Sequence, residues 1–154
     1  MAKTHFFSVG NPLFGDDGVG LAVLKELEVQ SEFVEDVFFD AHTDALAMID
    51  RFEPEGKNII IDAAKMGKQP GHVEIMQRQD VRMKIQWDHL SIHGFGLAGT
   101  LDMAEKIGVL PKELWVVGIE PEQIKIDTEL SPGIKVSISD VVEKIKKEVF
   151  GYET

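Results

Sequence analysis

The sequence predicts an α/β fold: a three-layer arrangement in which a mostly parallel, twisted sheet of about five strands has helices on both faces and one antiparallel edge strand. Strand-like and helix-like patterns alternate along most of the chain, as they do in a succession of βα units. Residues 58–64 contain an unbroken isoleucine run, which is typical of a parallel strand buried on both faces. A turn at Pro70-Gly71 leaves only a short connection to the next strand, which favours antiparallel pairing.

The first third of the chain predicts two βα units. The apolar run 5–9 predicts a buried strand, and the amphipathic segment 21–27 predicts the helix that follows it. Residues 35–40 predict a second short strand, which ends in a carboxylate. A second helix is expected over 43–52, with Thr43 as its N-cap. Its expected apolar face consists of Leu46, Ile49 and Phe52.

The middle of the chain predicts the centre and one edge of the sheet. Strand 58–64 is the central strand, and Asp62 lies near its end. Residues 72–76 alternate as a half-exposed strand would, and their short connection to strand 58–64 predicts a hairpin at the sheet edge. Residues 78–92 lack a regular pattern and predict a surface loop with room for one helical turn.

The last third predicts a helix, a buried strand and a closing helix. The first helix begins at Leu97, and the strand covers 113–119. Ser131-Pro132 fits an N-cap followed by proline at the first helical position, and Gly151 ends the closing helix. The residues expected to be buried on that helix are Ile134, Ile138, Val141, Val142, Ile145 and Val149.

Length and composition narrow the class of protein. A chain of 154 residues suits one domain over 1–154. The net charge of −11 disfavours nucleic acid and anionic membranes as partners. The absence of cysteine excludes disulfides, thiolate metal sites and a cysteine nucleophile. With no apolar stretch suited to a signal peptide or a membrane span, we expect a cytoplasmic protein.

A glycine-rich turn follows the first strand, with the sequence Gly10-Asn11-Pro12-Leu13-Phe14-Gly15-Asp16-Asp17-Gly18-Val19-Gly20. Such turns between a strand and a helix often cradle phosphate. Asp16 and Asp17 argue against that use, because two carboxylates would repel a phosphate at the helix N-terminus. They suit a cation or a proton-transfer role better, although a nucleotide- or phosphate-binding domain stays an alternative.

Three side chains are expected at one edge of the sheet: Asp17 in the first βα loop, Asp62 at the end of the third strand, and His93 just before a helix. Two carboxylates and an imidazole could bind a divalent ion and leave positions open for a substrate. We expect them to share a small pocket that solvent can reach. Each also has a structural explanation: a first-turn acid, a carboxylate serving a loop amide, and a helix cap.

Four motifs, taken together and in this order, resemble the hydrogenase maturation endopeptidases over about His5 to Phe150. They are Gly10-Asn11-x-x-x-Gly15-Asp16-Asp17-Gly18-x-Gly20, Asp62-Ala63, His93-x-x-Gly96-Leu97 and Gly118-Ile119-x-Pro121-Glu122. The resemblance implies an endopeptidase that removes the C-terminal extension of a nickel–iron hydrogenase large-subunit precursor after nickel insertion. The catalytic type would be aspartic or metal-assisted, with water as the attacking group.

The resemblance also implies roles for individual residues. Asp17, Asp62 and His93 would be the catalytic and nickel-contacting residues, with the nickel supplied by the precursor and not by a resident cofactor site. Asp16, Asp40 and His42 would contact the substrate, with Asp16 also supporting its loop. Relatives often have Asp-Gly-Gly after the second strand, whereas this chain has Asp40-Ala41-His42-Thr43, so the resemblance does not extend to substrate choice.

Two further expectations concern partners and alternatives. The partner is the hydrogenase large-subunit precursor, and the protein is expected to be a monomer. The main alternative is a non-enzymatic nickel-binding chaperone or checkpoint protein that recognises the loaded precursor without cutting it. The same acids and histidine would serve that protein, so the sequence does not separate the two.

Overall fold

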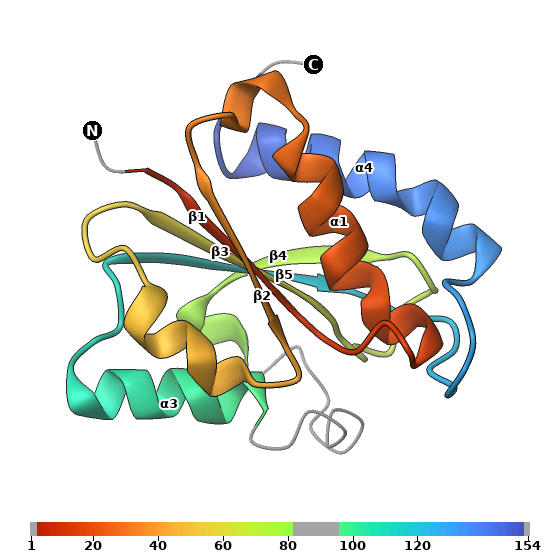
Figure 1. Cartoon of the computed structure of the whole chain (residues 1–154), viewed down its shortest axis with the longest axis horizontal. Helices are drawn as coiled ribbons and strands as arrows, with labels where there is room; N and C mark the ends of the chain where they lie inside the picture. The colour runs from red at the N-terminus through yellow and green to blue at the C-terminus, as the bar shows by residue number, and fades with distance from the viewer. Residues whose placement is uncertain (1–2, 82–95, 153–154) are drawn as a thin grey trace.

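The computed structural model describes residues 3–81 and 96–152, and these form a five-stranded sheet with the order β2-β1-β3-β5-β4 (Figure 1). Strands β1, β2, β3 and β5 are parallel, and β4 runs antiparallel to β5 at one edge. This confirms the predicted fold class. The strands are β1 (His5–Val9), β2 (Val37–His42), β3 (Lys57–Ala63), β4 (Val73–Gln77) and β5 (Glu113–Ile119).

Helices cover both faces of the sheet. Figure 1 shows α1 (Val19–Glu28) and α4 (Pro132–Glu148) on one face, and α3 (Leu97–Ile107) on the other. Short 3-10 helices connect these elements: η1 (Gly15–Gly18), η2 (Ser31–Phe33), η3 (Ala45–Arg51) and η4 (Arg78–Asp80). In the described residues, no helix is long and apolar enough to cross a membrane.

The central strand β3 separates two hydrophobic cores. Residues 58–63 are all buried, as the isoleucine run predicts. Because successive side chains point to opposite faces, Ile59 and Ile61 pack with the α1 and α4 side, whereas Ile60 packs with the α3 side. Asp62 follows the same alternation and therefore lies on the α3 side of the sheet.

The predicted hairpin between strands 58–64 and 72–76 is wrong, although β4 is the antiparallel edge strand. β5 lies between β3 and β4, and it pairs with β3 over seven residues. The connection crosses the carboxyl end of β5, where Ala64 N donates to Ile119 O and Gly71 N donates to Glu120 O. A short connection therefore joins two strands that are not neighbours in the sheet.

The helix predicted over 43–52 is a 3-10 helix that begins at Ala45, and Thr43 is not its N-cap. It buries Ala45 and Met48, not the predicted Leu46 and Ile49, which are only partly buried. The 3-10 repeat of three residues brings Ala45 and Met48 onto the same side, facing the core. Phe52 is buried, as predicted.

The closing helix matches its prediction most closely. α4 begins at Pro132 after Ser131, and Ile134, Val141, Val142 and Ile145 are buried on it. Ser131 makes no side-chain bond to the helix backbone, because its hydroxyl donates to Asp16 instead. Of the predicted loop 78–92, the structure describes only 78–81, where η4 forms one short turn; the rest lies outside the described residues.

Candidate active-site edge

Close approach of the first turn to the end of β1 depends on Gly10. Its φ is +139°, and a Cβ placed there would lie 2.1 Å from the carbonyl oxygen of Asp17. A side chain at this position would therefore force the turn away from the strand. Gly20 acts similarly in α1, since a Cβ there would lie 2.6 Å from the carbonyl oxygen of Ile61. Glycines thus set α1 and its preceding turn tightly against the carboxyl ends of β1 and β3.

Asp17 lies in η1 and is fully buried. Its Oδ2 accepts a hydrogen bond of 2.7 Å from the backbone N–H of Asn11. Its Cγ lies 3.6 Å from the position that a Cβ on Gly10 would take, directly after β1. The carboxylate is therefore held at the end of this strand, as predicted.

Asp62 lies at the end of the neighbouring strand. In the parallel ladders it pairs with Val9 of β1 and with Gly118 of β5. Only 2% of the residue is exposed. The fold therefore brings Asp17 and Asp62 to adjacent strand ends, although 45 positions in the sequence separate them.

Burial is where the two acids differ from the sequence-based expectation. We expected a pocket that solvent can reach, but Asp17 and Asp62 are both buried. His93 lies outside the described residues, so its position beside Asp17 and Asp62 stays a prediction. Among residues 3–81 and 96–152, no three histidine or acidic side chains are grouped so that they could hold a metal ion. The structure thus describes two of the three predicted ligands, Asp17 in the turn after β1 and Asp62 at the end of β3.

Asp16 has a different environment from Asp17, although it is also fully buried. Its carboxylate accepts four hydrogen bonds. The backbone N–H groups of Glu122 and Gln123 donate to Oδ2 at 2.9 Å each. Ser131 donates twice, from its N–H to Oδ1 at 2.6 Å and from its hydroxyl to Oδ2 at 2.7 Å. Asp16 therefore joins the first βα turn to the segment between β5 and α4; a direct contact with the substrate stays a prediction.

Asp40 and His42 form the end of the edge strand β2. Asp40 Oδ1 accepts hydrogen bonds from the Ser8 hydroxyl at 3.0 Å and from the His42 N–H at 2.9 Å. The His42 carbonyl accepts one from Gly10 N at 2.7 Å, beside a register shift between Ser8 and Val9. His42 is exposed, and its φ is +56°, in the left-handed region. At the end of β2, His42 therefore has a backbone conformation that glycine adopts more readily; we call this exposed strand end, Asp40 to His42, the rim of the candidate site.

We expect His42→Gly and His42→Val to have different stabilities. Glycine fits φ +56° without strain, so His42→Gly should keep the free energy of unfolding within about 0.5 kcal/mol, since strain relief and lost chain stiffness offset each other. A β-branched valine should cost about 1–2 kcal/mol at the same φ. Urea denaturation of both variants measures the difference. Equal stabilities would contradict the assigned backbone conformation.

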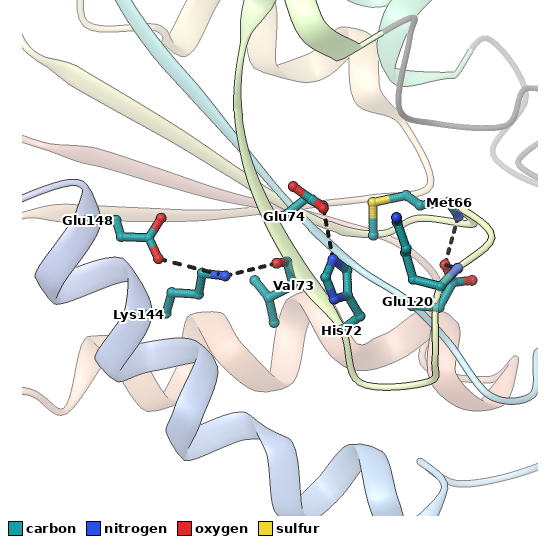
Figure 2. A network of polar contacts seen from close by, with 8 residues as sticks. Met66, His72, Val73, Glu74, Glu120, Lys144 and Glu148 are labelled. Carbon is teal, nitrogen blue, oxygen red and sulfur yellow. Dashed lines mark hydrogen bonds and ion pairs between the residues drawn. The ribbon is translucent and has the colours of Figure 1, made fainter.

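Glu120 is a further carboxylate at this edge that was not predicted from the sequence. It follows β5 directly, as a carboxylate at the end of a buried strand, which is the same signal that singled out Asp62. It is only 6% exposed, and its Oε1 accepts hydrogen bonds from Met66 N at 2.8 Å (Figure 2) and from Lys68 N at 3.0 Å. Glu120 thus contacts the segment that leaves β3 after Asp62.

Known proteins with similar sequence and structure point to one family. A family model described as HycI, hydrogenase maturation protease, matches residues 21–148. Hydrogenase 2 maturation protease of Escherichia coli is 28% identical over 141 residues, which cover 89% of this chain and 84% of the relative. Protein FrxA of Pyrococcus furiosus is 32% identical over 133 residues, covering 85% and 93% respectively. The solved structure of the E. coli hydrogenase maturating endopeptidase HybD has a TM-score of 0.79 at 21% identity, over 97% of this chain and 93% of that chain.

Proposed function

This chain belongs to the hydrogenase maturation protease family, and from that premise we propose that it removes the C-terminal extension of a nickel–iron hydrogenase large-subunit precursor after nickel insertion. Asp17 and Asp62 on adjacent strand ends carry the proposal, because carboxylates collected at the carboxyl edge of an α/β sheet are placed for ligand binding. Together with His93, they would contact the nickel that the precursor brings.

The chemistry follows from the groups available. Water attacks the scissile carbonyl, a carboxylate accepts the proton of that water, and the proton passes to the leaving amine as the peptide bond breaks. A nickel ion bound in the precursor can polarise the carbonyl when it lies nearby. Since Asp17 and Asp62 are buried, the proposal requires that docking of the precursor exposes at least one oxygen of each.

The remaining site residues have supporting roles in this proposal. Asp16 holds the turn that carries Asp17, through its hydrogen bonds to Glu122, Gln123 and Ser131. The exposed His42 contacts the substrate at the rim, and Asp40 fixes that rim through Ser8 and the His42 backbone.

Cleavage of a nickel-loaded precursor tests the proposal directly. We expect mass spectrometry to show loss of the C-terminal extension when the precursor is incubated with this protein, and no loss when the precursor lacks nickel. A metal-free precursor that is cut equally well would rule out nickel recognition. A loaded precursor that binds and stays intact would favour the checkpoint alternative.

A further inference from the structure

Glu120 connects the end of β5 to the segment that follows β3. One oxygen, Oε1, accepts hydrogen bonds from the backbone N–H groups of Met66, shown in Figure 2, and of Lys68. Between these two residues lies Gly67, whose φ is +75°. A glycine in the left-handed region lets flanking N–H groups converge on one acceptor, as in the anion-binding nests of tight turns. The turn at 66–68 is thus built around a carboxylate of this chain itself.

The backbone of Glu120 holds the far end of the same segment. Glu120 N donates to His72 O, and Gly71 N donates to Glu120 O, both at 2.8 Å. At the near end, Ala64 N donates to Ile119 O at 2.9 Å and extends the pairing of β3 with β5. Backbone bonds therefore fix both ends of 64–72, and the Glu120 side chain fixes the part between them.

This segment packs against Gly118, the residue of β5 that pairs with Asp62. Gly118 pairs with Asp62, and a Cβ on Gly118 would lie 3.1 Å from Ala64 Cβ and 3.4 Å from Met66 Sδ. Ala64 and Met66 therefore pack over Gly118 on the α3 side of the sheet, the side on which Asp62 lies. Moving the turn at Met66 would change the packing next to the Asp62 carboxylate.

We propose that Glu120 is a positioning residue for peptide cleavage: it holds the turn 66–68 so that Asp62 stays in its productive geometry. This inference rests on the proposed function. Without the carboxylate, the N–H groups of Met66 and Lys68 lose their acceptor, which favours relaxation of the turn. A displacement of about 1 Å near reacting groups can lower a rate about 100-fold.

Two substitutions separate geometry from charge. Both N–H groups use one oxygen, so the amide oxygen of Glu120→Gln can still accept them, whereas Glu120→Ala removes the acceptor. We expect Glu120→Ala to lower kcat for precursor cleavage about 10- to 100-fold with little change in KM. Glu120→Gln should restore cleavage to within about threefold of the original rate, because the acceptor geometry is kept. Hydrogen exchange at Met66 and Lys68 should speed up in the alanine variant only.

Lys146→Ala is the matched control for a loss of stability. Lys146 is buried in α4 and pairs with Glu32 at 3.1 Å, away from the end of β3. At a temperature where all variants are folded, the Lys146→Ala variant should cut the precursor at the same rate as the protein without substitutions. The inference would be overturned if Glu120→Ala kept the kcat of the original protein and showed no faster hydrogen exchange at Met66 and Lys68. It would also be overturned if Glu120→Gln cut the precursor as slowly as Glu120→Ala. If the unmodified protein fails to cut, the proposed function fails, and the exchange rates still decide whether Glu120 holds the turn.

Discussion

We expect Asp17→Asn to leave a nickel-loaded hydrogenase precursor almost uncut, with the cleavage rate lowered about 10²- to 10⁴-fold. Asparagine keeps the size of the side chain and an oxygen that can accept the Asn11 N–H, so the turn before α1 is preserved. It lacks the negative charge with which a carboxylate binds a metal ion strongly, and it cannot accept a proton as a general base. A time course of the extension's removal, followed by mass spectrometry, measures the rate.

Asp62→Asn should have an effect of the same size, since Asp62 lies at the end of β3, next to the end of β1 that Asp17 follows, and serves the same proposed site. Asp50→Asn is a control, because Asp50 is exposed on η3 and has no place in the proposed mechanism. Thermal unfolding shows that each variant is folded under the conditions of the assay. Full activity in both Asp17→Asn and Asp62→Asn would show that cleavage does not require these two carboxylates, and it would contradict the proposed mechanism.

Hydrophobic patterns predict the elements of this fold well where one pattern dominates. The isoleucine run of β3 and the helical spacing from Ile134 to Ile145 in α4 each favour one structure by burial alone. The order of strands depends on pairing between distant segments, so the short connection after β3 gave the wrong neighbour for β4. The choice of a 3-10 helix at η3 depends on how Ala45 and Met48 pack, which sequence spacing does not reveal.

In the candidate site, too, the sequence predicts some features and not others. The sequence places Asp17 and Asp62 at strand ends, and parallel pairing then brings those ends together. Their burial depends on packing from other elements and could not be predicted. Nor could the partners of Asp16, which lie 106 to 115 positions further along the chain. These two adjacent acids thus have different environments: Asp16 accepts hydrogen bonds from the segment between β5 and α4, whereas Asp17 Oδ2 accepts the Asn11 N–H.

Asp16→Asn is expected to lower the free energy of unfolding by about 2–4 kcal/mol, because the amide group turns a donor toward groups that are donors themselves. Oδ1 receives the Ser131 N–H, while Oδ2 receives two backbone N–H groups and a hydroxyl. Either orientation of the asparagine therefore leaves at least one buried backbone donor unsatisfied. Guanidinium denaturation measures the loss, and an unchanged m-value would attribute it to the folded state.

Ser131→Ala removes one hydrogen bond to Asp16, whereas Asp16→Asn places an amide donor against the donors that surround the carboxylate. Comparing the two variants separates these effects. Ser131→Ala removes the hydroxyl that donates to Oδ2, but the three backbone N–H groups keep their acceptor. We expect it to cost only about 1 kcal/mol, well below Asp16→Asn. If Asp16→Asn were as mild as Ser131→Ala, the four bonds would not hold the segment between β5 and α4. The turn that carries Asp17 would then owe its position mainly to Gly15 and to backbone hydrogen bonds. Gly15 has a φ of +60°, and a Cβ there would lie 2.8 Å from the Gln123 carbonyl oxygen, which accepts the Asp16 N–H.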